Sequence, residues 1–140
     1  MKFKILASLF LAIAVIYLCS SFKPQATGQV YFMRSTGMEG TIITYKVYLD
    51  DTLVCHLKNN HYSLHAVTPG EHTVSIQNTG LGNHKKSRPF KIKVVAGKSN
   101  YLSVKNQSGL GLDELAENSG LELLKKVLVT EQCLTAKDKN

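Results

Sequence analysis

Histidine side chains cluster in the middle of this 140-residue chain, where four of the five histidines lie between His56 and His72. Clustered imidazoles are typical ligands of zinc and other transition metals. His61 and His65, however, are four residues apart in a strand-like segment, which separates them by roughly 13 Å, whereas each metal bond spans only about 2 Å. His56 and His65 are expected to be diagonal neighbours across a hairpin and would still need a third ligand. We therefore expect no metal site and no cofactor, and an exposed polar sheet face.

A second group that could do chemistry is a basic run without any acidic residue, which consists of Lys85, Lys86, Arg88, Lys91, Lys93 and Lys98. Such a run could contact an anionic surface, for example phospholipid headgroups or an acidic glycan. We favour a structural interpretation, because Lys91 and Lys93 alternate with apolar residues, and outward lysines keep a strand from pairing with other chains. Phe90 is expected to point inward, so the interleaved aromatic residues of single-strand binders are missing, and no nucleic-acid partner is expected.

The remaining chemistry-bearing residues form no recognisable catalytic constellation. Asp50-Asp51 is a pair of carboxylates, yet it lies between two strand-like segments, where aspartate is a common turn residue. The chain has no Gly-x-Ser-x-Gly, His-Glu-x-x-His or Cys-x-x-Cys motif. Gly109-Leu-Gly111 does not open a strand–helix–strand unit of the kind that binds nucleotides. We expect that the protein is not an enzyme.

The N-terminus carries the pattern of a secretory signal, since two lysines in Met1–Lys4 precede the uncharged, apolar stretch Ile5–Leu18. An uncleaved anchor would need about 20 apolar residues, which this stretch reaches only if the next four residues are counted, so we favour cleavage. Lipidation of Cys19 is a third outcome. Bacterial lipoprotein signals normally place a small residue before the lipidated cysteine, whereas the residue before Cys19 is a leucine. We expect residues 1–26 to be a signal peptide, or else an N-terminal membrane anchor. The rest of the chain would be exported to the periplasm or outer surface of a bacterial envelope.

Removal of residues 1–26 leaves enough chain for one domain with one core. Three lysines leave with the signal, so the net charge falls by three, from +7 to +4, which is small for a nucleic-acid binder. Cys55 and Cys133 remain, and an oxidising compartment would permit a disulfide between them. The alternative is a buried free thiol at Cys55, on an inward strand face, with Cys133 unbonded in the tail.

Apolar residues at every second position indicate strands, and the short polar turns between them indicate antiparallel pairing. Four such segments form an expected β-meander, at Tyr45–Leu49, Leu53–Leu57, Tyr62–Ala66 and His72–Gln77. Three further strands are expected at Gln29–Arg34, Phe90–Val94 and Tyr101–Lys105. Seven short strands predict an all-β fold, an antiparallel β-sandwich over residues 27–130, followed by a polar tail over residues 131–140.

The Asn59-Asn60 dipeptide predicts a tight hairpin turn, because asparagine tolerates the positive φ that a two-residue loop requires. This turn would pair Leu57 with Tyr62. Because successive side chains alternate between faces, one face would carry the core residues Leu53, Cys55, Leu57, Tyr62, Leu64 and Ala66. The opposite, polar face would carry Val54, His56, Ser63 and His65.

A short helix is expected near the C-terminus, where Ser119-Gly-Leu-Glu122 has the spacing of a capping box. Leucines recur along one stripe of this helix, at Leu121, Leu124 and Leu128. We expect this stripe to dock the helix on a sheet or over an open sheet edge, where it would protect unpaired backbone groups.

Several segments together resemble a known family, namely Val47-Tyr-Leu-Asp-Asp51, Leu57-Lys-Asn-Asn60, Tyr62, Thr68-Pro-Gly-Glu-His-Thr-Val74, Val95-Ala-Gly-Lys98 and Tyr101-Leu102. They are similar to segments of short exported bacterial proteins known only as a domain of unknown function, often with a lipoprotein signal and with a pattern similar to PEGA domains. The likeness covers about residues 27–130, although Asp50-Asp51-Thr52 stands where many relatives have Asp-Gly. The resemblance implies a β-sandwich in the cell envelope, without an established activity or catalytic residues.

Together these patterns predict a non-catalytic, exported module of the cell envelope that supports or binds another envelope protein through an exposed sheet face or edge. The alternative is a module that binds a glycan or an anionic surface through the basic run over residues 85–98. In that case Tyr31, Tyr48 or Tyr62 would serve as stacking platforms. Membrane association, in either case, would run through the N-terminus.

Overall fold

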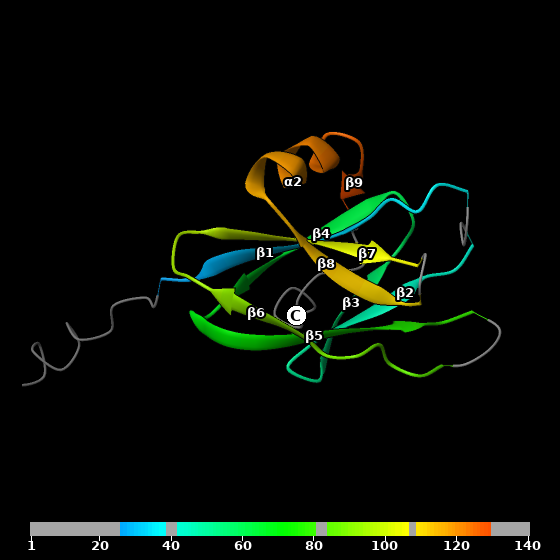
Figure 1. Ribbon diagram of the computed structural model, residues 1–140, viewed down its shortest axis with the longest axis horizontal. Helices are drawn as coiled ribbons and strands as arrows, with labels where there is room; N and C mark the ends of the chain where they lie inside the picture. Colours follow the sequence, from blue (N-terminus) through cyan, green and yellow to red (C-terminus); the bar gives the residue numbers. More distant parts are fainter. Residues whose placement is uncertain (1–25, 39–41, 81–83, 107–108, 130–140) are drawn as a thin grey trace, which may run out of the picture.

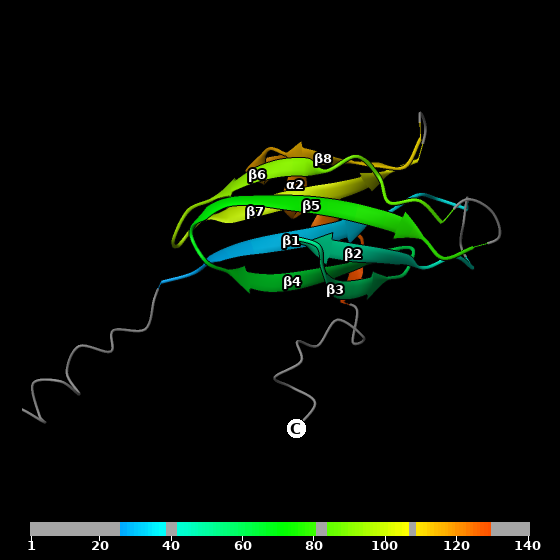
Figure 2. The same cartoon turned by 90° about the horizontal axis from the view of Figure 1, so that it is seen from below.

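Two β-sheets pack face to face in the computed structural model, and a short helix lies on the outer side of one of them (Figures 1 and 2). The structure describes residues 26–38, 42–80, 84–106 and 109–129. The five-stranded sheet contains β1 (Gly28–Arg34), β4 (His61–Val67), β7 (Ser99–Lys105), β8 (Gly111–Leu115) and β9 (Leu128–Val129). The four-stranded sheet contains β2 (Tyr45–Leu49), β3 (Thr52–Leu57), β5 (Gly70–Asn78) and β6 (Phe90–Val94), and the helix is α2 (Glu117–Leu124).

The five-stranded sheet is mixed. Its strand order is β8-β7-β1-β4-β9, with β1 parallel to β7 and β4 parallel to β9, whereas the four-stranded sheet, in the order β3-β2-β5-β6, is antiparallel. The predicted β-rich fold with a short C-terminal helix is confirmed, but the purely antiparallel pairing is wrong. β8 and β9 are additional to the seven predicted strands. Alternation within one segment shows that it is a strand, but it does not show which distant strand lies beside it.

The expected meander is interrupted, because β3 and β4 lie in different sheets. The β2–β3 hairpin is present, and its two central residues, Asp50 and Asp51, have φ angles of 47° and 61°. Positive φ at both positions is the requirement of a tight two-residue hairpin loop, so the predicted turn at Asp50-Asp51 is confirmed. The predicted hairpin at Asn59-Asn60 is wrong. That dipeptide carries the chain from one sheet to the other.

A buried amide holds this connection between the sheets. The Asn59 side chain accepts hydrogen bonds from Thr36, from its backbone N–H at 3.0 Å and from its hydroxyl at 2.9 Å, and donates one to the Gly37 carbonyl at 2.6 Å. A buried amide with its partners satisfied favours one conformation of the loop. Asn59 therefore stabilises a crossover between sheets, which is a different role from that of a hairpin turn.

The predicted core face is correct for part of β3 and inverted for β4. Cys55 and Leu57 are buried as expected, but Leu53 is 42% exposed, because a register shift between Val47 and Tyr48 places Leu53 opposite Tyr48, on the outer face. In β4 the buried residues are Ser63, His65 and Val67, while Leu64 and Ala66 are exposed and Tyr62 is half-buried. The inward residues of β4 were predicted from hairpin pairing with β3, but β4 pairs in the other sheet, so this pairing does not set its inward face. A shift of one residue exchanges the inward and outward side chains of a strand.

The main core lies between the two sheets. It contains Val30, Phe32, Tyr45, Val47, Cys55, Leu57, Val67, Val74, Ile76, Ile92, Val94, Leu102, Val104 and Leu112. Each large apolar side chain that leaves water in this way contributes about 1.5–3 kcal/mol to folding. Both sheets supply residues to this core, which explains why neither sheet is expected to be stable without the other.

Helix α2 docks on the sheet through a glycine and not through the predicted leucine stripe. Its N-cap is Ala116 without a side-chain hydrogen bond, so the capping box at Ser119 and Glu122 is wrong. Gly120 is buried against the ring of Tyr101 in β7, and a Cβ atom at this position would overlap that ring. Leu121, by contrast, is 44% exposed. Close approach of the helix backbone to the aromatic ring requires glycine here.

Two predicted segments fall outside the described residues, namely residues 1–25 with Cys19, which comprise nearly all of the expected signal, and residues 130–140 with Cys133. Across the ranges that the structure describes, no helix is long and apolar enough to cross a membrane.

Candidate functional site

The outer face of the four-stranded sheet gathers the chemistry that the sequence analysis singled out. Strand alternation sends Val47 of β2 and Ile76 of β5 into the core. The residues beside them, Lys46, Tyr48 and Gln77, therefore project outward. This face carries Lys86, Lys91 and Lys93 of the basic run, so we call it the basic face.

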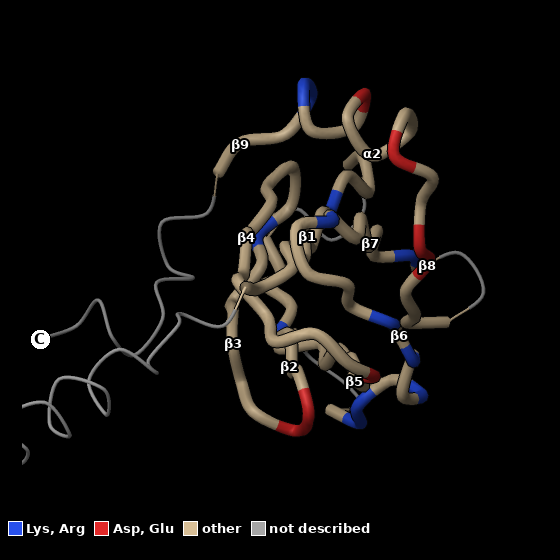
Figure 3. Tube along the Cα trace, turned by 90° about the vertical axis from the view of Figure 1, so that its left-hand side faces the viewer, with Lys and Arg blue, Asp and Glu red and all other residues tan. Residues whose placement is uncertain are grey.

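On the edge strand β6, the predicted alternation of the basic run is confirmed. Lys91 and Lys93 are exposed. Ile92, which lies between them, and Val94, which follows Lys93, are buried. Lys93 lies opposite Glu71 of β5 in the register, and Lys91 lies opposite Thr73. The rest of the run, Lys85, Lys86, Arg88 and Lys98, is also exposed. Figure 3 shows basic positions along β6 and in its neighbourhood, and acidic positions on β8 and α2.

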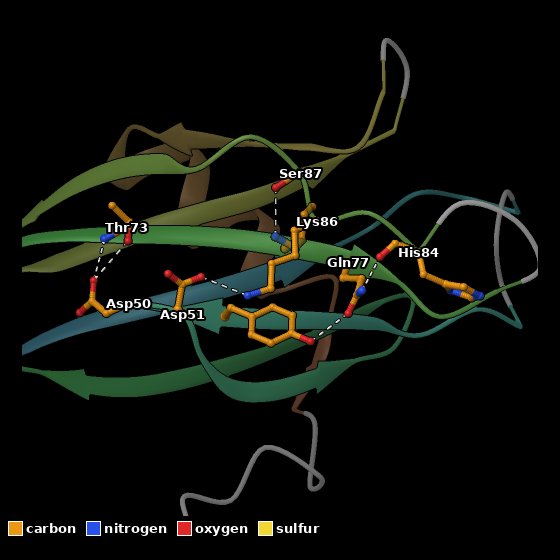
Figure 4. Close-up of polar contacts among 9 residues, drawn as sticks. Asp50, Asp51, Thr73, Gln77, His84, Lys86 and Ser87 are labelled. Atoms are coloured by element: carbon orange, nitrogen blue, oxygen red, sulfur yellow. Dashed lines mark hydrogen bonds and ion pairs between the residues drawn. The ribbon is translucent and has the colours of Figure 1, made fainter.

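Lys86 is the member of the run with the most defined contacts. Its ammonium group lies 3.1 Å from the Asp51 carboxylate and 3.9 Å from the centre of the Tyr48 ring (Figure 4). Asp51 is 88% exposed, so the ion pair is weak, and the cation–π contact adds a modest stabilisation. These contacts hold the segment after residue 84 across the basic face, where Gln77 and Lys86 form an isolated bridge.

His72 and Asp50 form a structural ion pair beside this face. The His72 ring donates from Nδ1 to the Asp50 carboxylate at 2.6 Å and from Nε2 to the Thr68 carbonyl at 2.8 Å. Asp50 also accepts a hydrogen bond from the Thr73 N–H at 2.9 Å. The hydrogen bond to Asp50 raises the pKa of His72, and the same bond, followed by that from Thr73, lowers the pKa of Asp50. Both ring nitrogens are donors to acceptors of the fold, so the pair fastens the β2–β3 turn to β5. Sequence reasoning missed this pair, because 22 residues separate its members.

The other predicted histidines do not meet. His56 lies on the outer face of the four-stranded sheet, while His65 is 5% exposed and lies between the sheets, with a ring nitrogen 3.2 Å from the Ser63 hydroxyl. Burial lowers the pKa of His65, which favours a neutral imidazole in the core. The expected diagonal between His56 and His65 is wrong, because their strands belong to different sheets. Within the described ranges, no three His, Cys, Asp or Glu side chains group as metal ligands.

Arg34 is a buried charge that sequence reasoning missed. It is 0% exposed at the end of β1, its guanidinium lies 3.9 Å from the centre of the Tyr45 ring, and Nη1 donates to the Ile43 carbonyl. Burial lowers the pKa of this side chain. Arg34 therefore connects the five-stranded sheet to the segment that leads into β2, and its role is structural.

Cys55 is disulfide-bonded and 2% exposed. The disulfide excludes the alternative of a free thiol at this position. Both candidate partners within the chain, Cys19 and Cys133, lie outside the described residues, so the pairing with Cys133 stays a prediction.

The outer face of the five-stranded sheet is aromatic and apolar, in contrast to the basic face. Tyr31 stacks on Tyr101 with ring centres 5.0 Å apart and lies 6.2 Å from the ring of Tyr62. Burial raises the pKa of Tyr31. Tyr62 is thus an outward residue and not a core residue, and the candidate stacking platforms Tyr31 and Tyr62 lie together, whereas Tyr48 lies on the basic face.

Apolar side chains continue this surface toward β9. Leu64 of β4 is 43% exposed and Val129 of β9 is 58% exposed, whereas Leu128, which is 68% exposed, projects from the opposite face of β9 by strand alternation. Val129 lies opposite Tyr62 in the parallel pairing of β4 with β9. We call Tyr62, Leu64 and Val129 the apolar edge. Contiguous exposed apolar groups mark interaction surfaces more often than single ones do.

A family model described as "Protein of unknown function (DUF2846)" matches residues 24–119. This match confirms the resemblance to a domain family of unknown function. No curated protein and no solved structure matches the chain.

Proposed function

The chain belongs to this family of proteins of unknown function, DUF2846, and from that premise we propose that it is a non-catalytic, exported module of the bacterial cell envelope that binds another envelope protein. The observation that carries the proposal is the apolar edge at β4 and β9, where Leu64 and Val129 expose large apolar side chains. Burial of such side chains against a partner gains about 25 cal/mol for each Å² removed from water.

The polar contacts of the site support a binding role over catalysis. Among the described residues, His72 and Asp50 form the dyad that most resembles acid–base machinery. A general base needs a ring nitrogen that can reach the substrate proton. Both nitrogens of His72 instead face acceptors of the fold, Asp50 and the Thr68 carbonyl. Turnover of any member of an envelope-substrate panel by the pure protein would contradict this part of the proposal.

The binding role is tested by site-specific photo-crosslinking in the native envelope. A photo-reactive side chain at Leu64 or Val129 is expected to give a reproducible adduct with one envelope protein. The control position is Val95, which is also an exposed valine at 41% but follows β6, away from the apolar edge. Adducts from all three positions, or from none, would contradict a specific surface at β4 and β9.

A second candidate function is binding to an anionic surface or glycan through the basic run. The observation that favours it is the exposure of Lys85, Lys86, Arg88, Lys91 and Lys93 on and beside one sheet. Their joint change to glutamate is expected to abolish sedimentation with vesicles that contain phosphatidylglycerol at low salt. The control changes two exposed lysines elsewhere, Lys58 and Lys126, to glutamate. Equal loss in both variants would show a mere net-charge effect.

A further inference from the structure

A polar cavity of about 410 Å³ opens on the basic face, at the end of the sheet where β2 begins and β5 ends. Its lining consists of Thr44, Lys46, His56, Gln77, Asn78, Thr79 and His84. In the sheet register, Lys46 lies between His56 of β3 and Gln77 of β5, so their three side chains stand side by side on adjacent strands. His84 comes from the segment that returns across the face, and its carbonyl accepts a hydrogen bond from the Gln77 amide (Figure 4).

The wall of this cavity is held by its own hydrogen bonds. The Gln77 side chain accepts from the Tyr48 hydroxyl at 2.8 Å and donates to His84, so both ends of its amide are in use. The Thr44 and Thr79 hydroxyls lie 2.9 Å apart, and the Thr79 hydroxyl also lies 2.7 Å from the Thr44 carbonyl. A wall fixed in this way does not have to reorganise when a ligand enters, which lowers the cost of binding.

The groups that remain to meet a ligand are nitrogen donors. They are the half-buried ammonium of Lys46, the imidazole of His56 and the outer nitrogen of the His84 ring, whose Nδ1 lies 3.2 Å from the Asn78 carbonyl. The lining contains no carboxylate, and none of the ion pairs between described residues involves Lys46. The ammonium of Lys46 would repel a metal cation between the two histidines, whereas all three groups can donate to an oxyanion.

We propose that this cavity binds an oxyanion, a phosphate or carboxylate group, with Lys46 as the central contact and His56 and His84 on either side. Charge-assisted hydrogen bonds inside a hollow are stronger than those on an open surface, because less water competes for the ligand. The site is distinct from the exposed run on β6, and it goes beyond the proposed binding of an envelope protein, whose surface lies on the other sheet.

The test is calorimetric titration of the purified protein with inorganic phosphate and, separately, with glucuronate as a carboxylate. Saturable binding of at least one anion is expected, and Lys46→Met is expected to weaken it by about tenfold or more, since one charge-assisted contact is lost. Lys58→Met is the matched control, because it removes the same charge from an exposed lysine that belongs to neither the cavity nor the basic run, and the anion affinity should be unchanged. Circular dichroism and urea unfolding of both variants establish that they are folded.

Three results would overturn the proposal. Equal affinity of the Lys46 and Lys58 variants would assign binding to diffuse charge. Binding only to anionic vesicles, without binding of free phosphate or glucuronate, would assign it to the exposed run. Zinc binding that depends on His56 and His84 and is tighter than anion binding would replace the oxyanion with a metal. His56→Gln serves as the second variant, with a smaller expected loss of anion affinity. Photo-crosslinking at Leu64 is independent of all these outcomes, so failure here and failure of the proposed function can be told apart.

Discussion

The outer faces of the two sheets follow the same alternation rule but present opposite chemistry. On the five-stranded sheet, Tyr101 lies beneath α2 and stacks on Tyr31, and Leu64 and Val129 are exposed apolar residues on β4 and β9. On the four-stranded sheet, the outer residues include Lys91, Lys93, Tyr48 and Gln77. Tyr48 donates a hydrogen bond to Gln77 and forms a cation–π contact with Lys86. An outward strand position can be strongly apolar where a later element covers it, and it is polar where water remains the neighbour. Leu53 and the apolar edge are exposed exceptions to this rule.

The largest expected effect compares one tyrosine from each outer face. Tyr101 is 4% exposed beneath α2, whereas Tyr48 is half-buried on the basic face. Tyr101→Ala should lower the free energy of unfolding by about 3 kcal/mol or more, because it leaves a cavity under the helix. Tyr48→Ala should cost less than about 2 kcal/mol, since water replaces much of the lost contact. Urea unfolding of both variants measures the difference, and equal losses would erase the distinction between a covered and an uncovered face.

The docking of α2 is probed next by adding a single methyl group. Gly120→Ala is expected to destabilise the fold by about 1–3 kcal/mol, because its Cβ meets the Tyr101 ring. Gly111→Ala in β8 is the control, since a Cβ there meets no heavy atom within 4 Å. Thermal unfolding compares the two. If Gly120→Ala were as stable as the control, the helix would not be held by this close contact.

The His72–Asp50 pair predicts a pH dependence of stability beside the basic face. The pKa of His72 is raised, so its contribution is complete below the unfolded pKa of about 6.5 and is lost as the pH rises through the folded pKa. The pKa of Asp50 is lowered, so its contribution is present above about pH 3.9 and is lost as the pH falls through the folded pKa. Stabilisation by the pair is therefore greatest between about pH 4 and pH 6.5.

Urea unfolding as a function of pH measures this contribution, which should stay below about 1 kcal/mol because Asp50 is half-exposed. His72→Gln should flatten the decline above pH 6.5, and Asp51→Asn, on the neighbouring turn residue, should leave it unchanged. A decline that persists in the His72 variant would assign it to another group.

The smallest effect concerns the ion pair between Lys86 and Asp51. Asp51→Asn should change the free energy of unfolding by less than about 0.5 kcal/mol, because Asp51 is almost fully exposed. The same change releases Lys86 and should strengthen sedimentation with anionic vesicles at low salt but not at high salt. Vesicle binding that is unchanged, or that rises equally at both salt concentrations, would show that the basic run does not act through its free charge.

Part of the candidate site followed from local patterns. The turn at Asp50-Asp51 and the outward lysines of β6 were predicted correctly, because positive φ and strand alternation are properties of neighbouring residues. The cavity around Lys46 was not, since His84 reaches it through contacts with the distant residues Gln77 and Asn78. The buried position of Arg34, at the end of an otherwise well-predicted strand, also had no local signal.

The amino-acid sequence by itself determined seven of the strands, that a short helix follows them, and that the chain belongs to a family whose pattern it shares. Only the tertiary structure decided which strands are neighbours. The strand pairing in turn determines the inward face of β4, the burial of His65 and the apolar edge beside β9. The physical reason is that alternation has a period of two and leaves the choice of inward face open. That choice is made by the sheet against which the strand packs.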